Sequence, residues 1–326
     1  MSRYPEFNNT EVQPAVPNCR QVLVEQFAGI PRAGASFAEF LESFPHIYAG
    51  SDIRTVVDRV VTARRQGRAV ILSCGAHVVK CGLAPALIAL MEEGLVTAVA
   101  VNGAFAIHDV EIACYGTTSE KVEQGLKEGT FGMAAEPAAW FNRVLTGARE
   151  EQLGAGEALG RELVRQQAPF RANSLLAAAY RLEMPMTVHI AIGTDIVHMH
   201  PNADGAAYGE TSLRDFRILT AAMRSLAGGG VLVNLGSAVL LPEVLLKAVA
   251  LLRHENPGFT GFLGVDCDFI RQYRATLQVV NRIGSLGGEG IALTGHHEIL
   301  IPLLSFAIME AWQAGARRPQ EAGQEF

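Results

Sequence analysis

Short, largely apolar runs recur along the chain, separated by longer segments in which apolar positions follow helical spacing. Continuous apolar runs are typical of strands that are covered on both faces. The runs that predict strands are Ala69–Cys74, Val96–Asn102, Met186–Ile192, Val231–Leu235, Phe259–Val265, Tyr273–Asn281 and Ile291–Thr294. They predict a mostly parallel central sheet.

The segments between these runs predict helices. Ser51 and Asp52 can cap a helix that ends near Arg65, and Gly94 follows a helix over Lys80–Glu93. Further helices are expected over Ser212–Leu226, Leu241–Arg253 and Glu298–Ala314, and a helical block over Ser119–Ala168. This alternation predicts a doubly wound α/β fold, a Rossmann-like sheet with helices on both faces and right-handed crossovers.

Domain boundaries follow from composition. Residues 1–35 are rich in Pro, Asn and Gly and predict an N-terminal extension. No internal repeat or clear linker interrupts residues 36–315, which predict a single domain. The polar residues 316–326 predict a disordered tail.

The stretch from Thr97 to Ala113 places candidate chemistry beside a strand. It reads as a buried strand, a turn at Asn102-Gly103, and a helix start that carries His108, Asp109 and Glu111. A helix that begins at the carboxyl edge of a parallel sheet is a common ligand site. We expect His108 and Asp109 to be catalytic acid/base groups, with metal binding or helix capping by Asp109 as the alternatives.

Other polar residues follow the later strands in the same way. Asp195 comes after an apolar strand and a glycine, and a carboxylate in that position needs a partner. His296 and His297 stand at a helix N-terminus, which favours neutral imidazole. We expect both to be catalytic, as a base or a ligand, with a structural cap as the alternative.

A metal site is a second possibility. His198 and His200 alternate, so on an extended segment both side chains would lie on one side. With Asp195 they could bind a divalent metal such as zinc. This set would suit a metal-dependent hydrolase or lyase, in which the ion activates water.

Five segments in order resemble the deoxyhypusine synthase family, over roughly residues 36–315. They are AVILSCGAHVVKCGL, VAVNGAFAIHDVEIA, PMTVHIAIGTDIV, GGGVLVNLGSAVLLPEVLL and GIALTGHHEILIPLL. The resemblance implies a Rossmann-like fold that binds NAD at the strand edges, in a homo-oligomer. The positions that it places against the cofactor are Cys74, Gly75, Asn102, Gly103, Asp195, Gly236 and Ser237.

The chain departs from that family where its chemistry resides. The family oxidises a polyamine with NAD and captures the aminobutyl group on a lysine before the last strand, but residues 268–289 contain no lysine here. The family's Lys-His-His run is replaced by Leu241-Pro242-Glu243. We therefore expect an NAD-dependent transferase-like enzyme acting on a small amine or polyamine-type substrate rather than a protein lysine. A non-catalytic ligand-binding relative is the alternative, and Lys80 is the lysine that could replace the missing one.

Composition narrows the class further. The 326 residues are 49% hydrophobic and 18% charged, with a formal net charge of -6, which argues against a nucleic-acid partner. The five cysteines form no CxxC pair and no export signal is evident, so we expect reduced thiols and a cytoplasmic location. No apolar run reaches the roughly 18 residues of a membrane span. The low charge favours self-association, and the resemblance implies a dimer or tetramer.

Overall fold

The computed structural model describes residues 3–7 and 22–321 of the chain. It divides into two compact units, Met1–Asp52 and Ile53–Phe326, so the boundary falls inside a helix rather than at the expected residue 35. The first unit contains η2 (Val24–Gln26), α1 (Phe37–Glu42) and the start of α2 (Tyr48–Arg65). Ser36 caps α1 by accepting a hydrogen bond from Glu39 N, and the Glu39 carboxylate accepts one from the Ser36 backbone N–H.

Six parallel strands form one sheet in the order β3-β2-β1-β4-β5-β6. They are β1 (Val70–Cys74), β2 (Ala98–Asn102), β3 (Met186–His189), β4 (Val231–Leu235), β5 (Leu263–Asp268) and β6 (Glu289–Thr294). This order confirms the predicted doubly wound, Rossmann-like α/β fold. The strand order reverses between β1 and β4, and ligands of such sheets bind at the carboxyl ends beside that point.

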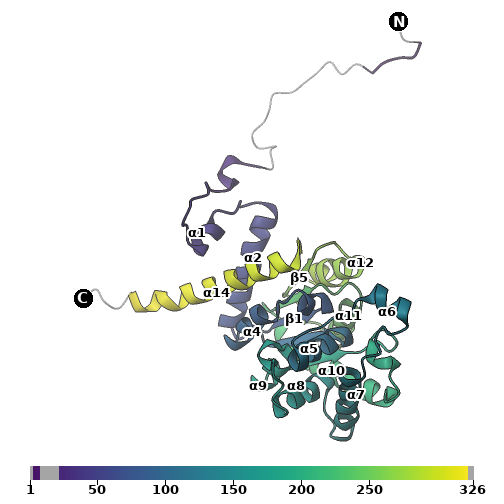
Figure 1. Cartoon of the computed structure of the whole chain (residues 1–326). Helices are drawn as coiled ribbons and strands as arrows, with labels where there is room; N and C mark the ends of the chain where they lie inside the picture. The colour runs from purple at the N-terminus through teal and green to yellow at the C-terminus, as the bar shows by residue number, and fades with distance from the viewer. Residues whose placement is uncertain (1–2, 8–21, 322–326) are drawn as a thin grey trace. The chain divides into compact units, whose positions relative to one another are not determined.

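The second unit also contains the remaining helices (Figure 1). They are α3 (Ala76–Lys80), α4 (Ala84–Glu92), α5 (Gly103–Tyr115), α6 (Val122–Glu128), α7 (Ala135–Glu150), α8 (Ala155–Arg165), η3 (Arg171–Asn173), α9 (Leu175–Arg181), η4 (Ile196–Met199), α10 (Gly205–Met223), η5 (Arg224–Leu226), α11 (Leu240–Glu255), α12 (Tyr273–Ala275), η6 (Thr276–Asn281), α13 (Arg282–Ser285) and α14 (His297–Glu321). Within the described residues, none of the helices has the length and apolarity that a membrane crossing requires.

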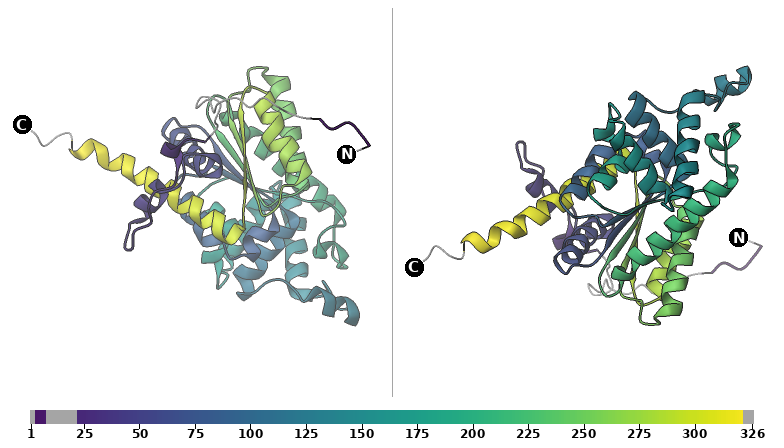
Figure 2. Two further views of the ribbon diagram at one scale, coloured as in Figure 1. Left: turned by 90° about the horizontal axis from the view of Figure 1, so that it is seen from above. Right: turned by 90° about the horizontal axis from the view of Figure 1, so that it is seen from below.

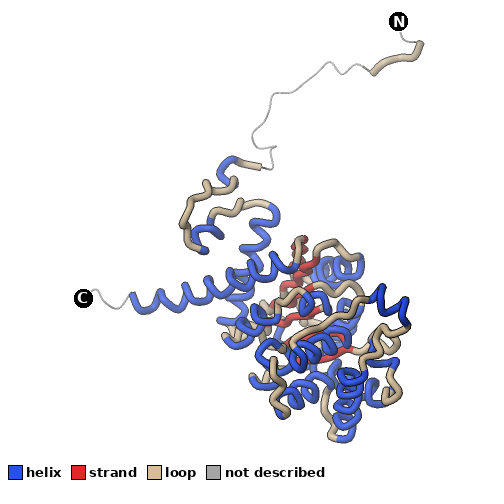
Figure 3. The backbone as a smooth tube through the Cα atoms, viewed as in Figure 1, coloured by secondary structure: helices blue, strands red, loops and turns tan. Residues whose placement is uncertain are grey.

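Helices cover both faces of the sheet, as Figures 2 and 3 show. Alternate residues of β1 point to opposite faces. Val70 and Leu72 face α4, α14 and the 53–65 part of α2. Ile71 faces the other way, into a core with Leu219 of α10 and Leu245 of α11. Both faces of the central strands are therefore buried, which explains why these strands are largely apolar.

The predicted strand over Tyr273–Asn281 is wrong, because this segment is helical in α12 and the π-helical η6. Its buried residues Ala275, Val279 and Ile283 follow a spacing of four, which is a helical period. Glycines in the neighbouring strands let this backbone lie close, since a Cβ at Gly264 would lie 2.1 Å from the Val279 carbonyl oxygen. The strand was predicted because β-branched residues in this segment favour a strand locally.

Several predicted boundaries also differ. Strand β3 ends at His189 rather than Ile192, and β5 begins at Leu263 and continues to Asp268. Helix α10 begins at Gly205, within the glycine-rich segment that precedes Ser212. Helix α14 continues to Glu321, into the stretch expected to be a disordered tail, and residues 322–326 lie outside the described residues.

Replacing Gly156 by alanine should destabilise the domain by about 3 kcal/mol or more. A Cβ at Gly156, in the first turn of α8, would lie 1.8 Å from the Met186 carbonyl oxygen, so α8 would have to move off β3. Gly147, inside α7, has nothing within 4 Å of such a Cβ. Gly147→Ala should therefore stabilise by up to about 1 kcal/mol through helix propensity. Chemical denaturation of both variants measures the contrast, and equal effects would contradict the packing.

Candidate functional site

A cavity of about 190 Å³ opens where β2 and β3 end. Its wall is formed by the first turns of α5, by residues 194–196 after β3, and by the segment around α6. Its polar and charged lining consists of Lys80, His108, Glu111, Ser119, Glu120, Thr194 and Asp195. The structure thus brings together two residues that the sequence predicted, His108 and Asp195, which are 87 positions apart.

His108 belongs to a small hydrogen-bonded cluster. Its Nδ1 lies 2.7 Å from Thr118 Oγ1 and 3.2 Å from Glu111 Oε2, and the Thr118 hydroxyl donates to Glu111 Oε2 at 2.5 Å. Burial opposes ionisation of Glu111, but the hydrogen bonds from His108 and Thr118 outweigh it and lower the pKa of that carboxyl. The cavity therefore contains an ionised Glu111, and His108 keeps Nε2 available.

Asp195 lies directly on the backbone of Gly103. A Cβ at Gly103 would be 2.0 Å from Asp195 Oδ2, so only glycine admits this carboxylate. Burial raises the pKa of Asp195 to about 6, while a hydrogen bond from Thr194 and the charge of His108 oppose the rise. Within the described part of the chain, Oδ2 is buried without a hydrogen-bond partner, as is Nε2 of His198, 4.0 Å away.

Asp109 faces away from this cavity. Its Oδ2 accepts a hydrogen bond from the Ser174 hydroxyl at 2.5 Å, and its two oxygens accept from the backbone N–H groups of Leu175 and Leu176. These groups form the N-terminus of α9, so Asp109 caps that helix. The structure thus favours the capping alternative, and burial raises the pKa of Asp109 to about 6.

The two adjacent histidines at the start of α14, His296 just before the helix and His297 as its first residue, are in different environments. His297 is buried beneath Gly236, its Nε2 lies 3.5 Å from Asp268 Oδ1, and neither ring nitrogen has a hydrogen-bond partner within the described residues. Burial lowers the pKa of His297, and the charge of Asp268 opposes this. The side chain of His296 is 73% exposed and lies 3.8 Å from Glu298 Oε1. Only His297 faces the sheet edge.

The other positions expected against a cofactor already have protein partners. Cys74 is fully buried, which raises the pKa of its thiol to about 12, and a Cβ at Gly75 would lie 2.1 Å from the Gly236 carbonyl oxygen. The Asn102 side chain accepts a hydrogen bond from Phe105 N and caps α5. The Ser237 hydroxyl accepts one from Leu241 N. These residues shape the turns of the sheet edge, and their contact with a nucleotide stays a prediction.

The sequence analysis did not predict the row of hydrogen-bonded polar side chains that crosses the middle of the sheet. Asn234 donates to Asp266 Oδ1 at 2.8 Å, and its own Oδ1 accepts from the Ser73 hydroxyl at 3.3 Å. Burial raises the pKa of Asp266 to about 6, aided by the charge of Asp268. The available signal was Ser73 and Asn234, polar residues inside predicted apolar runs, because a buried polar group needs a partner.

The expected metal set does not assemble as the H-x-H pattern predicted. Residues 196–199 form the short helix η4, so His198 and His200 do not share one side of an extended segment. His198 Nδ1 instead accepts from the backbone N–H groups of Gly193 and Asp195. His200 Nε2 lies 2.9 Å from the Gly132 carbonyl oxygen. Only His198 and Asp195 approach each other.

Comparisons with known proteins support the fold. A family model described as the C-terminal Rossmann fold of ArgZ-like arginine dihydrolases matches residues 54–131. The structure of AgrE in a ternary complex with ornithine and NAD+ aligns with 80% of this chain at 16% identity and a TM-score of 0.54. Unliganded AgrE aligns with 81% at 15% identity and a TM-score of 0.53. This chain spans about a third of the AgrE chains, 33% and 34%.

The resemblance to deoxyhypusine synthase stays a prediction. A putative deoxyhypusine synthase from Entamoeba histolytica aligns with 85% of this chain and 94% of its own at 12% identity, with a TM-score of 0.49. No curated protein matches the chain in sequence. The family model and the two AgrE structures support a Rossmann-like fold for this chain.

Proposed function

We propose that this protein is an NAD-dependent enzyme that acts on a small amine. The observation that carries the proposal is the cavity beside β2 and β3, which gathers three carboxylates, Glu111, Glu120 and Asp195, around a space of about 190 Å³. Drug-sized ligands occupy pockets of roughly 300–1,000 Å³, so this space suits a smaller molecule. AgrE, whose fold is similar, has been captured with ornithine and NAD+.

The charges of the cavity favour a cation. Glu111 is ionised, and Glu120 Oε1 is a buried oxygen without a hydrogen-bond partner in the described residues. An ammonium group offers three donors and would satisfy such oxygens. Lys80 lines the same cavity, and its ammonium group would pair with a carboxylate of the ligand. A diamino acid such as ornithine carries an ammonium group for the carboxylates of the cavity and a carboxylate for Lys80.

The polar groups at the sheet edge suit a dinucleotide. Asp195 Oδ2 can accept from a ribose hydroxyl, as acidic residues of dinucleotide-binding folds do. His297 offers two buried ring nitrogens that have no hydrogen-bond partner among the described residues, although Nε2 lies 3.5 Å from Asp268 Oδ1, on the far side of the point where the strand order reverses. When bound, NAD would supply a hydride acceptor for oxidation of the carbon next to the amine.

The residues of the cavity would accept the proton that the substrate ammonium releases. His108 Nδ1 is engaged with Thr118 and Glu111, which leaves Nε2 to accept a proton from the substrate ammonium. Glu111 would stabilise the imidazolium that results. Lys80 is the lysine of this cavity, whereas residues 268–289 contain none. We therefore favour chemistry on a free amine over transfer to a protein lysine.

Glu120→Gln tests the amine site. We expect this variant to bind ornithine about 10- to 100-fold more weakly than the parent, because a charged hydrogen bond contributes about 1.5–3 kcal/mol. Glu123→Gln, an exposed carboxylate of α6, is the matched control. Isothermal titration with NAD present measures both, and norvaline, which lacks the side-chain amine, should not bind. Equal ornithine affinity of the two variants would contradict the proposal.

A further inference from the structure

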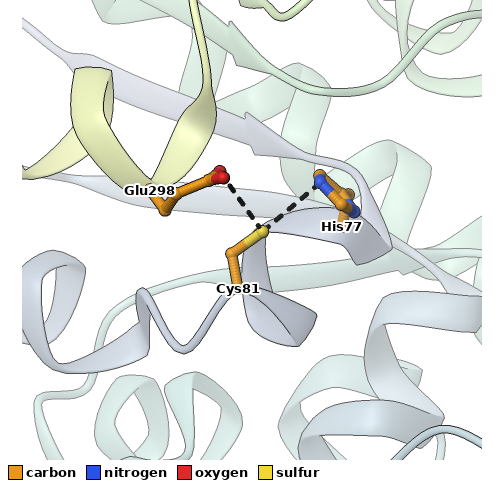
Figure 4. Close-up of side chains that lie close together, drawn as sticks. All are labelled: His77, Cys81 and Glu298. Atoms are coloured by element: carbon orange, nitrogen blue, oxygen red, sulfur yellow. Dashed lines mark hydrogen bonds between the residues drawn. The ribbon is translucent and has the colours of Figure 1, made fainter.

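Three potential metal ligands from distant parts of the sequence meet beside the carboxyl end of β1 (Figure 4). His77 belongs to α3, Cys81 is the residue that ends it, and Glu298 belongs to the first turn of α14. Cys81 Sγ lies 3.3 Å from His77 Nε2 and 3.8 Å from Glu298 Oε2, and the three ligand atoms all lie within 4.8 Å of one another. Among the described residues, 3–7 and 22–321, these three are the His, Cys, Asp or Glu side chains whose ligand atoms lie close enough together to share one metal ion.

The spacing of the ligand atoms fits a tetrahedral ion. Zinc lies about 2.3 Å from a cysteine sulfur and about 2.0–2.2 Å from histidine nitrogen or carboxylate oxygen. Those bond lengths and a tetrahedral angle place the ligand atoms about 3.4–3.6 Å apart. The two observed separations from Cys81 Sγ bracket that range. Small side-chain rotations would therefore admit an ion without moving the backbone.

The fold holds the three side chains at this place. His77 and Cys81 are four residues apart, so both lie on one face of α3. The His77 ring packs against Phe269 and His297, with ring centroids 5.7 Å and 5.3 Å apart. Glu298 approaches from α14, as the yellow ribbon in Figure 4 shows. Two separate elements thus supply the ligands.

The combination of ligands selects the class of metal. Magnesium and calcium bind through oxygen atoms, and a cysteine sulfur is foreign to their sites. Cysteine, histidine and a carboxylate together suit zinc, and cobalt(II) can replace it as a probe. Three protein ligands leave a fourth position open to water.

We propose that His77, Cys81 and Glu298 form a zinc site. The proposal does not depend on the amine cavity, whose lining contains none of these three residues. It also differs from the set His198, His200 and Asp195, which the structure does not assemble. The sequence carried one local signal for it, the H-x-x-x-C spacing of His77 and Cys81, which runs from the predicted turn into the predicted helix over Lys80–Glu93.

Metal binding by the full chain, purified without an affinity tag and stripped with a chelator, tests the site. We expect one equivalent of zinc per chain, and a thiolate-to-metal absorption band in the near ultraviolet when cobalt(II) is added. Cys81→Ser should remove the band. It should also weaken zinc binding by about a hundredfold or more, because loss of an outer-shell partner already costs 10- to 100-fold.

Matched variants separate this site from surface binding. Glu298→Gln should weaken zinc binding, whereas Cys114→Ser and Glu310→Gln, which change the same residue types elsewhere, should leave it unchanged. Thermal unfolding without metal checks that each variant is folded. Absence of zinc binding, a missing thiolate band, or equal zinc affinity in the Cys81 and Cys114 variants would overturn the proposal.

Discussion

Asp109→Ala should destabilise the protein by about 3–5 kcal/mol. Asp109 is fully buried and accepts hydrogen bonds from the Ser174 hydroxyl and from the N–H groups of Leu175 and Leu176. The alanine variant leaves these donors unsatisfied in the interior, and each buried unsatisfied group costs about 1–3 kcal/mol. Urea denaturation measures the loss.

Asp204→Ala is the matched control for that change. Asp204 caps α10 by accepting from Ala206 and Ala207, but its side chain is 33% exposed, so water can replace it. We expect a loss of about 1 kcal/mol there. Equal losses for the two variants would contradict a buried cap. An Asp109→Ala protein with normal stability and no activity would instead restore the catalytic interpretation.

Asp215→Asn should become more stable relative to the parent as pH rises from about 4 to 7. Burial, with a contribution from the charge of Glu157, raises the pKa of Asp215 from 3.8 to about 7. Between those values the folded state binds the proton and the unfolded state does not, so the parent loses stability with rising pH. A shift of this size corresponds to a difference on the order of 4 kcal/mol. Asparagine does not titrate, so the Asp215→Asn variant does not lose stability in this way as pH rises.

The asparagine variant can keep the local structure. Asp215 Oδ2 accepts from Gly156 N and Val188 N, and the amide oxygen of asparagine can do the same. Denaturant unfolding of both proteins at several pH values gives the difference in the free energy of unfolding. Asp58→Asn, at an exposed position of α2, should show no such trend. A difference that stays constant from pH 4.5 to 8 would show that Asp215 ionises normally.

The fold was predictable because its signal is local. Apolar runs such as Val231–Leu235 and the glycines that follow them define buried parallel strands, and the order of elements then restricts the topology. The prediction of a strand over Tyr273–Asn281 was wrong because it, too, relied on a local signal. Its β-branched residues favour a strand locally, whereas the buried spacing of Ala275 and Val279 is set by packing on the sheet.

The candidate site was less predictable because its contacts join distant segments. The sequence shows Asp109 beside His108, but its partner Ser174 is 65 residues away, so capping and catalysis could not be separated. Cys81 and Glu298 are 217 residues apart, and no pattern links them. Asp195 was expected to have a functional role because a carboxylate after an apolar strand and a glycine needs a partner. The structure buries it against Gly103, and its role stays a prediction.

The glycines of the sheet edge have a role that the sequence did not predict. Gly103 and Gly236 were expected to lie against the cofactor. In the structure, the space where a Cβ would lie holds Asp195 at Gly103 and His297 at Gly236. The absence of a side chain is used to bring a carboxylate and an imidazole to the edge. The polar atoms at this edge that have no hydrogen-bond partner among the described residues are the features that favour a ligand.

Equilibrium titration of the full chain with NAD+, alone and with saturating ornithine, tests the central claim most directly. We expect one NAD+ per chain, tighter binding when ornithine is present, and weaker binding of NAD+ by Asp195→Asn than by Asp204→Asn. No binding of NAD+ at millimolar concentration, with or without ornithine, would contradict the account.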